Sequence, residues 1–300
     1  MARHFLDLDV FPKMELLKIL KRAETLKLGR RGLDDLRGKT LAMIFEKAST
    51  RTRISFEVAM RELGGDTIAL TGKEMQLEHG ESLADTARVM NRFVHALMVR
   101  TFEHENLQDL ARHATIPVIN GLTNSSHPCQ VMADLMTVQE KFHRLEGLRV
   151  AWCGDGGSNV LMSWLQTAAT FNFQLAIASP ESLMPDPKRL APYQAKADIQ
   201  IFKEPADALK GADVVLTDTW VSMHNEDGDK RRVLLKPYQI NSAHMKLAKP
   251  QAVFMHCLPA HRGEEVTAEV IDGPQSAVWD EAENRLHVQK AILLWCFGKV

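Results

Sequence analysis

The stretch GKTLAMIFEKASTRTRISFEVAMRELGG, residues 38–65, decides the fold of the first half of this chain. Its apolar opening, residues 38–45, predicts a buried strand, and residues 50–63 predict a helix that ends at a glycine pair. Between the strand and the helix stand two hydroxyl–arginine pairs, which suit an anion better than an apolar core. The stretch therefore predicts a strand–loop–helix unit with an anion site at the start of the helix.

The same alternation of strands and helices continues along the chain. In the first half we predict further strands at 66–70, 96–101 and 116–123, and helices at 13–28, 82–93, 106–114 and 129–142. In the second half we predict a strand with a glycine-rich turn at 147–157, strands at 174–180 and 252–260, a helix followed by a strand at 204–220, and helices at 159–171 and 285–298. This alternation predicts an α/β protein with two domains, each a parallel sheet flanked by helices.

The composition is that of a globular protein with about two domains. The chain has 300 residues, a formal net charge of -1, 45% hydrophobic residues and 25% charged residues. Such a balance indicates neither a nucleic-acid partner nor a membrane partner held by bulk charge. The four cysteines are widely spaced, which argues against a disulfide framework or a zinc cluster and is typical of a reducing compartment. The sequence shows neither a signal-peptide pattern nor a long apolar run, so we expect a cytoplasmic protein.

Polar or otherwise unusual residues follow six of the predicted strands. They stand at 49–53, 100, 127–130, 154–159, 218–223 and 256–259. Ligands of parallel α/β sheets bind at the carboxyl ends of the strands, where the helices begin. Since three of these positions fall in each half of the chain, we expect an active site in a cleft between the two domains.

The first of these positions has the chemistry of a phosphate site. Ser49 or Thr50 can cap the following helix, whose first backbone N–H groups point toward an anion. The planar guanidinium of Arg51 suits phosphate oxygens. A helix cap followed by solvated arginines is the alternative, and the residues alone leave both interpretations open.

Three motifs together resemble the signature segments of the carbamoyltransferases. They are STRTR (49–53), HPCQ (127–130) and HCLP (256–259), which occur in this order. DTWVSM (218–223) and DEAENRLHVQKA (280–291) are similar to segments of the ornithine-specific branch of that family. The resemblance covers essentially the whole chain, and the combination is far more specific than any one tetrapeptide.

The resemblance implies a reaction and a domain organisation. The carbamoyl group of carbamoyl phosphate would pass to the δ-amine of L-ornithine, giving citrulline and phosphate in arginine biosynthesis, without metal or organic cofactor. Residues 1–143, closed by a terminal helix at 285–300, would bind carbamoyl phosphate, and residues 144–284 would bind ornithine. The active unit would be a homotrimer in which a loop carrying Gln76 reaches a neighbouring subunit's site.

The resemblance also implies roles for individual residues. Carbamoyl phosphate would bind to Ser49, Thr50, Arg51, Thr52, Gln76, Arg100, His127, Gln130, Cys257, Leu258 and Arg285. Ornithine would bind to Asn159, Asp218, Ser222 and Met223. The catalytic residues would be Arg100, His127, Asp218 and Cys257. In this scheme His127 donates a hydrogen bond rather than acting as a general base, and the Leu258 carbonyl accepts from the carbamoyl NH2 group.

Several of these residues also have a plain structural interpretation. His127 could be a buried histidine bonded to the backbone, and Cys257 could be a core cysteine. Arg285 could be a solvated charge in the first turn of the last helix. The sequence leaves these alternatives open.

One departure from the family pattern bears on the choice of substrate. His224 stands where the family has a glycine after Ser-Met, and the polar residues 225–232 that follow are expected to be mobile. N-acetylornithine, N-succinylornithine and putrescine therefore stay open as alternative substrates, whereas the motifs argue against aspartate. A dinucleotide-binding turn at 149–159, as in an NAD-dependent dehydrogenase, is a more distant alternative, because Asn159 replaces the third glycine of that fingerprint.

Overall fold

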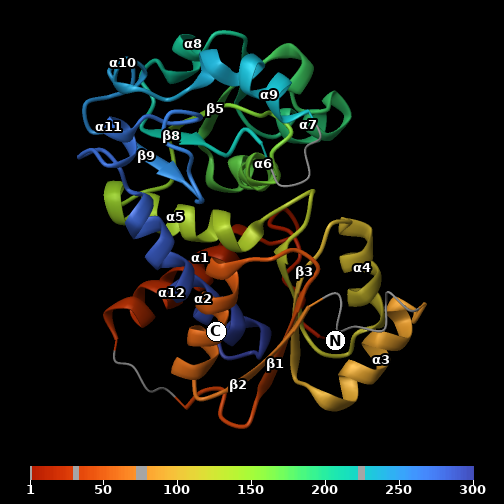
Figure 1. Cartoon of the computed structure of the whole chain (residues 1–300). Helices are drawn as coiled ribbons and strands as arrows, with labels where there is room; N and C mark the ends of the chain where they lie inside the picture. Colours follow the sequence, from red (N-terminus) through yellow and green to blue (C-terminus); the bar gives the residue numbers. More distant parts are fainter. Residues whose placement is uncertain (1, 30–33, 72–79, 222–226) are drawn as a thin grey trace. The chain divides into compact units, whose positions relative to one another are not determined.

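The computed structural model describes the chain except for residues 1, 30–33, 72–79 and 222–226. The chain divides into two compact units, each with its own parallel sheet (Figure 1). Unit 1 comprises Met1–Met136 and Asn284–Val300, and unit 2 comprises Thr137–Glu283. The two-domain α/β prediction is confirmed, whereas the boundary after residue 143 and the location of the site between the domains stay predictions.

Unit 1 is built on a four-stranded parallel sheet with the order β2-β1-β3-β4. Its strands are β1 Thr40–Phe45, β2 Asp66–Thr71, β3 Ala96–Arg100 and β4 Val118–Leu122. Its helices include α1 Lys13–Leu28, α2 Thr50–Glu62, α3 Leu83–Phe93 and α4 His104–His113, together with parts of α5 Pro128–Phe142 and α12 Val278–Cys296. The chain places β2 and β3 on opposite sides of β1, so the strand order reverses between β1 and β3.

The central strands β1 and β3 of unit 1 are apolar on both faces because helices cover both faces. Ala42 and Ile44 of β1 pack with residues of α3 and α4 in one core cluster. Met43, the residue between them, points to the other face and is completely buried. Figure 1 shows α3 and α4 on one face of this sheet and α1, α2 and α12 on the other. The near-continuous apolar run that predicted β1 thus reflects burial on two sides.

Unit 2 is built on a five-stranded parallel sheet with the order β7-β6-β5-β8-β9. Its strands are β5 Arg149–Cys153, β6 Gln174–Ala178, β7 Ile199–Phe202, β8 Val214–Thr217 and β9 Val253–His256. Its helices include α6 Asn159–Phe171, α7 Pro187–Gln194, α8 Pro205–Leu209, α9 Gly228–Leu235, α10 Ser242–Met245 and α11 Ala268–Ile271. Here the strand order reverses between β5 and β8, so each unit has one such switch point.

Among the described residues, no helix is both long and apolar enough to cross a membrane.

Two predictions about the second half of the chain are wrong. Residues 228–232, expected to be mobile, belong to α9, because Arg231 is buried and anchors the helix. Its Nε donates to the Trp220 carbonyl at 2.9 Å and its guanidinium pairs with Asp155. The last helix begins at Val278 rather than at 285, and acidic residues in its first turn stabilise that earlier start.

Candidate active site

In unit 1, polar side chains gather at the switch point between β1 and β3. Helix α2 starts directly after β1, and Ser49 caps it by accepting a hydrogen bond from the Thr52 N–H at 3.2 Å. The first turn of α2 contains no acidic residue, and its second residue is the exposed Arg51. This end of α2 therefore presents backbone N–H groups and a guanidinium to the same region, as an anion requires.

The two arginines of the STRTR motif have different surroundings. The Nε of Arg53 donates to Glu57 Oε1 at 2.9 Å, one turn along the helix surface. Both of these side chains are at least partly exposed, so the pair is a surface ion pair of small energetic value. Arg53 thus has a local partner on α2, and Arg51 is the arginine of this motif that we assign to the anion.

Arg285 connects two of the predicted segments within unit 1. Its side chain is buried, and its guanidinium donates to Thr52 Oγ1 at 2.9 Å and to Gln130 Oε1 at 3.2 Å. The Gln130 amide is fixed in turn, because its Nε2 donates to Asp134 Oδ1 at 2.9 Å. The interpretation of Arg285 as a solvated charge at a helix start is therefore wrong, since α12 begins earlier and buries it.

The turn before α5 holds His127 in a fixed place. Thr123 Oγ1 accepts the backbone N–H groups of Ser125 and Ser126 at 3.2 and 3.1 Å. The Thr123 N–H donates back to the Ser126 carbonyl at 2.9 Å, and Asn120 Nδ2 donates to Ser126 Oγ at 3.0 Å. His127 follows this closed turn directly and is 4% exposed, so its ring is presented from a rigid support.

The electrostatics of unit 1 bring His127 and three arginines together. Burial, followed by the positive charges of Arg285, Arg100 and Arg51, holds the pKa of His127 well below its usual value. The imidazole is therefore neutral at physiological pH and can donate a hydrogen bond through one ring N–H. Three cations therefore act on one buried neutral ring, so the surroundings of His127 carry positive charge.

This arrangement predicts a pH-dependent loss of stability. In the unfolded chain His127 titrates near its usual pKa of 6.5, whereas in the folded chain it takes up a proton only at much lower pH. Between these two pKa values the unfolded state binds more protons, so the free energy of unfolding falls as the pH drops below about 6.5. The slope from this group approaches about 1.4 kcal/mol per pH unit. Urea unfolding of the native protein and of His127→Gln between about pH 5 and pH 7 measures it. Equal slopes in the two proteins would contradict the pKa assignment.

In unit 2, the switch point between β5 and β8 carries a second polar cluster. Asp218 follows β8, and Ser158 caps α6 after the turn that leaves β5. The Ser158 hydroxyl donates to Asp218 Oδ2 at 3.1 Å and accepts the Val160 N–H at 3.1 Å. Asn159 is the first residue of α6, so the structure brings the two predicted ornithine residues Asn159 and Asp218 to the same edge of the sheet.

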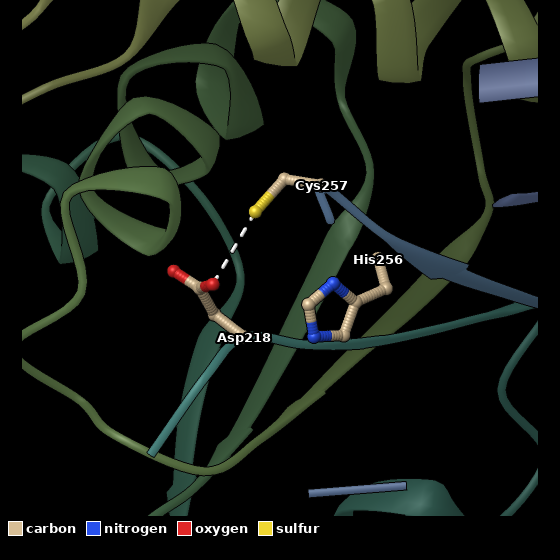
Figure 2. A group of neighbouring side chains, drawn as sticks. All are labelled: Asp218, His256 and Cys257. Carbon is tan, nitrogen blue, oxygen red and sulfur yellow. Dashed lines mark hydrogen bonds between the residues drawn. The ribbon is translucent and has the colours of Figure 1, made fainter. Parts of the chain in front are cut away.

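The carboxylate of Asp218 is held by several donors. Its Oδ1 accepts the Thr219 N–H at 2.7 Å and the thiol of Cys257 at 3.3 Å, the contact drawn as a dashed line in Figure 2. Cys257 follows β9, the neighbour of β8, and is partly exposed, so it is not a core cysteine. A fixed carboxylate beside a thiol can attract an ammonium group and orient an amine next to it.

Asp218, His256 and Cys257 are close enough together to resemble a metal site (Figure 2). Both ring nitrogens of His256, however, have protein partners. Nδ1 lies 2.8 Å from the Leu258 N–H, and Nε2 lies 3.2 Å from Glu265 Oε1. A metal ion would have to displace one of these partners, so the three residues do not fit a preformed metal site.

The glycine-rich turn after β5 packs closely against a later segment of the same unit. A Cβ at Gly156 would lie 2.5 Å from the Leu183 carbonyl oxygen and 2.6 Å from Cδ of Pro185. The Gly156 N–H donates to Ser179 Oγ at 3.0 Å. The glycine is therefore needed for packing against residues 183–185, and this argues against the dinucleotide-binding interpretation.

Not every predicted residue can be placed, and some partners were not predicted. Gln76, Ser222 and Met223 lie outside the described residues, as does His224. Asp155 and Ser158 lie in the predicted range 154–159, but no individual role was predicted for them. Arg231, and Glu265 and Glu281 around His256, were not predicted as site residues at all. Their partners stand far away in the sequence, as for Ser158 and Asp218, which are 60 residues apart. The residue types alone therefore gave no signal for these contacts.

The chain matches known families and proteins over nearly its whole length. Residues 3–140 match the family described as aspartate/ornithine carbamoyltransferase, carbamoyl-P binding domain. Residues 146–296 match its counterpart, the Asp/Orn binding domain. An ornithine carbamoyltransferase of Rhodopseudomonas palustris is 59% identical, over 99% of this chain and 98% of the relative. One from Bradyrhizobium diazoefficiens is 56% identical, over 99% and 98%.

The chain is also similar in structure to solved ornithine carbamoyltransferases. Ornithine carbamoyltransferase from Pyrococcus furiosus superposes with a TM-score of 0.92 and 45% identity, covering 100% of this chain and 98% of that chain. The enzyme from Thermus thermophilus superposes with a TM-score of 0.91 and 42% identity, covering 99% of each chain. The likeness therefore extends over both units of the fold.

Proposed function

Since this chain belongs to the aspartate/ornithine carbamoyltransferase family, we propose that it transfers the carbamoyl group of carbamoyl phosphate to the δ-amine of L-ornithine. The products are citrulline and phosphate. The observation that supports this most strongly is the buried neutral His127, on which three guanidinium groups act beside the start of α2. A dianion with a carbonyl next to it suits such a pocket.

Unit 1 supplies the groups that bind carbamoyl phosphate. The phosphate lies at the start of α2, where Ser49, Thr50, Arg51 and Thr52 and the first backbone N–H groups neutralise its charge. Arg100 and the N–H of His127 donate to the carbamoyl oxygen, and Gln130 also contacts the carbamoyl group. Negative charge develops on that oxygen during attack, so donors that are already in place stabilise the transition state. Arg285 completes the phosphate site and keeps Thr52 and Gln130 in position.

Unit 2 supplies the groups that bind ornithine. Asp218 attracts an ammonium group of the amino acid, Asn159 binds its backbone, and Cys257 lies beside the attacking nitrogen. The δ-amine must first lose a proton, because an ammonium group has no lone pair to form the new bond. Its nitrogen then bonds to the carbamoyl carbon, and the bond from that carbon to the phosphate oxygen breaks with its electron pair on phosphate. The second proton of the attacking amine leaves with the phosphate product.

The biological setting follows from the same resemblance. The enzyme would serve arginine biosynthesis in the cytoplasm and act as a homotrimer, with Gln76 contributing to the site of a neighbouring subunit. The names of the ornithine carbamoyltransferases that this chain resembles support the reaction, and the trimer and the pathway are inferred from the family alone. Size-exclusion chromatography with light scattering would test the trimer directly.

A substrate panel tests the proposed reaction. We expect carbamoyl transfer from carbamoyl phosphate to L-ornithine, and much lower rates with N-acetylornithine, N-succinylornithine, putrescine and aspartate. Product formation is measured by the colour reaction of the ureido group together with release of phosphate. A higher rate with a substituted ornithine would keep the reaction class and change the substrate, in which case His224 becomes the first residue to exchange. Reduction of NAD with no carbamoyl transfer would contradict the proposal altogether.

A further inference from the structure

His256 is a buried histidine at the end of β9 whose ring is fixed at both nitrogens. Nδ1 lies 2.8 Å from the backbone nitrogen of Leu258, and Nε2 lies 3.2 Å from Glu265 Oε1. The side chains of His256 and Glu265 are both completely buried. Cys257, which contacts Asp218, is the residue between His256 and Leu258, and a ring nitrogen of His256 lies within 4.8 Å of the Cys257 sulfur and of a carboxylate oxygen of Asp218.

The direction of these hydrogen bonds fixes the protonation of the ring. A backbone N–H can only donate, so Nδ1 must accept the bond from Leu258 and carries no proton. The ring proton is therefore on Nε2, which donates it to the Glu265 carboxylate. Only this neutral tautomer satisfies both contacts, because a proton on Nδ1 would face the Leu258 N–H.

Leu258 adopts a backbone conformation that its neighbours must impose. Its φ is 56°, in the left-handed region that residues with a Cβ rarely adopt. Such conformations persist where surrounding contacts over-determine them, and they concentrate at functional sites. The imidazole two residues earlier supplies one such contact, because it receives the Leu258 N–H within this turn. That bond fixes the peptide plane between Cys257 and Leu258. The direction of the Leu258 carbonyl, in the next peptide, follows from that plane through the φ and ψ of Leu258.

Two buried carboxylates hold the histidine itself. The backbone N–H of His256 donates to Glu281 Oε2 at 2.8 Å, from the first turn of α12. Glu265 Oε1, the acceptor of the ring proton, also accepts the His261 N–H at 2.6 Å. Both the main chain and the ring of His256 are therefore anchored by buried carboxyl groups, a costly arrangement in a protein interior that a packing role alone does not require.

From this geometry we propose that His256 is a positioning residue for the transfer reaction. Its neutral ring, held by Glu265, keeps the Leu258 carbonyl directed so that it can accept from the carbamoyl NH2 group. The inference rests on the proposed function and on the role that the family resemblance implies for Leu258, whose carbonyl would accept from that NH2 group. It assigns to the histidine of the HCLP motif a part that needs no contact with substrate or metal.

Two substitutions separate this role from a purely structural one. The Oδ1 of His256→Asn can occupy the place of Nδ1 and accept the Leu258 N–H, but the variant loses the contact with Glu265. His256→Gln keeps a donor near the place of Nε2 for Glu265 and loses the acceptor for Leu258. We expect kcat/KM for carbamoyl phosphate to fall about 100-fold in His256→Gln, because a misdirected carbonyl costs rate, and at most about tenfold in His256→Asn.

Stability should follow the opposite order. His256→Asn leaves the buried Glu265 carboxylate with one partner fewer and should melt at the lower temperature, whereas His256→Gln keeps that partner. If His256→Asn does not fold, the double variant His256→Asn/Glu265→Gln removes the uncompensated charge and takes its place. Activities that follow the melting temperatures, or that are equal in the two variants, would overturn the proposal. Native protein that forms no citrulline would instead show that the proposed function is wrong.

A spectroscopic measurement checks the tautomer without any assay of activity. Long-range ¹H–¹⁵N spectra of native protein labelled at histidine nitrogen should show His256 with an unprotonated Nδ1 and a protonated Nε2 at neutral pH. The signal is assigned by its absence from His256→Gln. A proton on Nδ1 would contradict the proposed hydrogen bond from Leu258.

Discussion

Replacing Arg51 with alanine is expected to abolish measurable saturation by carbamoyl phosphate and to lower kcat/KM for this substrate about 1000-fold. The guanidinium is exposed at the first turn of α2, next to backbone N–H groups that have no acidic side chain to compensate them. Its removal takes away both a charge-assisted hydrogen bond to phosphate and part of the positive field around His127. Steady-state kinetics and calorimetric titration with carbamoyl phosphate measure the loss.

Arg53 provides the matched control for this experiment. It stands in the same turn of α2, but its guanidinium binds Glu57 on the surface of the helix. Arg53→Ala removes the same charge from the same helix and should change kcat/KM less than about threefold. The fold should survive both changes, because neither arginine is buried. Equal losses in the two variants would show that net charge, rather than the placement of Arg51, governs binding.

The start of α2 shows what the sequence could predict. An apolar strand, a serine cap and a helix with a glycine stop are local patterns, and they placed β1 and α2 within one or two residues of their observed bounds. The candidate residues at the strand ends were predictable for the same reason, because in a parallel sheet the ends of successive strands meet at one edge. The strand order completes the argument, since Ser49 and Arg100 flank the switch point of unit 1, and Asn159 and Asp218 flank that of unit 2.

The contacts that fix these residues could not be predicted in the same way. The burial of Arg285 depends on an earlier start of α12 and on partners in α2 and α5, 233 and 155 residues away in the sequence. Helix α9 looked like a mobile polar segment because its anchor, the ion pair of Arg231 with Asp155, joins residues 76 positions apart. A polar segment is usually exposed to solvent, unless one of its charged residues pairs in the interior with an opposite charge far away in the sequence. Only the fold shows which residue that partner is.

Asp218→Asn is expected to raise KM for ornithine by about 100-fold or more while leaving the fold nearly as stable as before. Asparagine has the same shape, and its Oδ1 can still accept a hydrogen bond from the Thr219 N–H or from the Ser158 hydroxyl. What disappears is the negative charge that we propose faces the ammonium group of the substrate. The effect on KM for carbamoyl phosphate should be small, because its phosphate is assigned to residues of unit 1 and Asp218 is assigned to the amine. Initial-rate kinetics with each substrate varied in turn separates the two constants.

Asp213→Asn is the matched control, because Asp213 immediately precedes the first residue of β8, whereas Asp218 follows the last. Its carboxylate is buried and accepts from Lys249 Nζ at 2.8 and 2.9 Å and from the Arg149 N–H at 2.9 Å. Loss of that charge should cost about 1–3 kcal/mol of unfolding free energy, and it should leave KM for ornithine unchanged below the melting temperature. The two variants should therefore have opposite effects. Asp218→Asn should weaken ornithine binding and leave stability nearly unchanged, and Asp213→Asn should lower stability and leave ornithine binding unchanged. If Asp218→Asn lowered stability and left KM for ornithine as it was, the carboxylate beside Cys257 would be structural, and the amine site would have to lie elsewhere in unit 2.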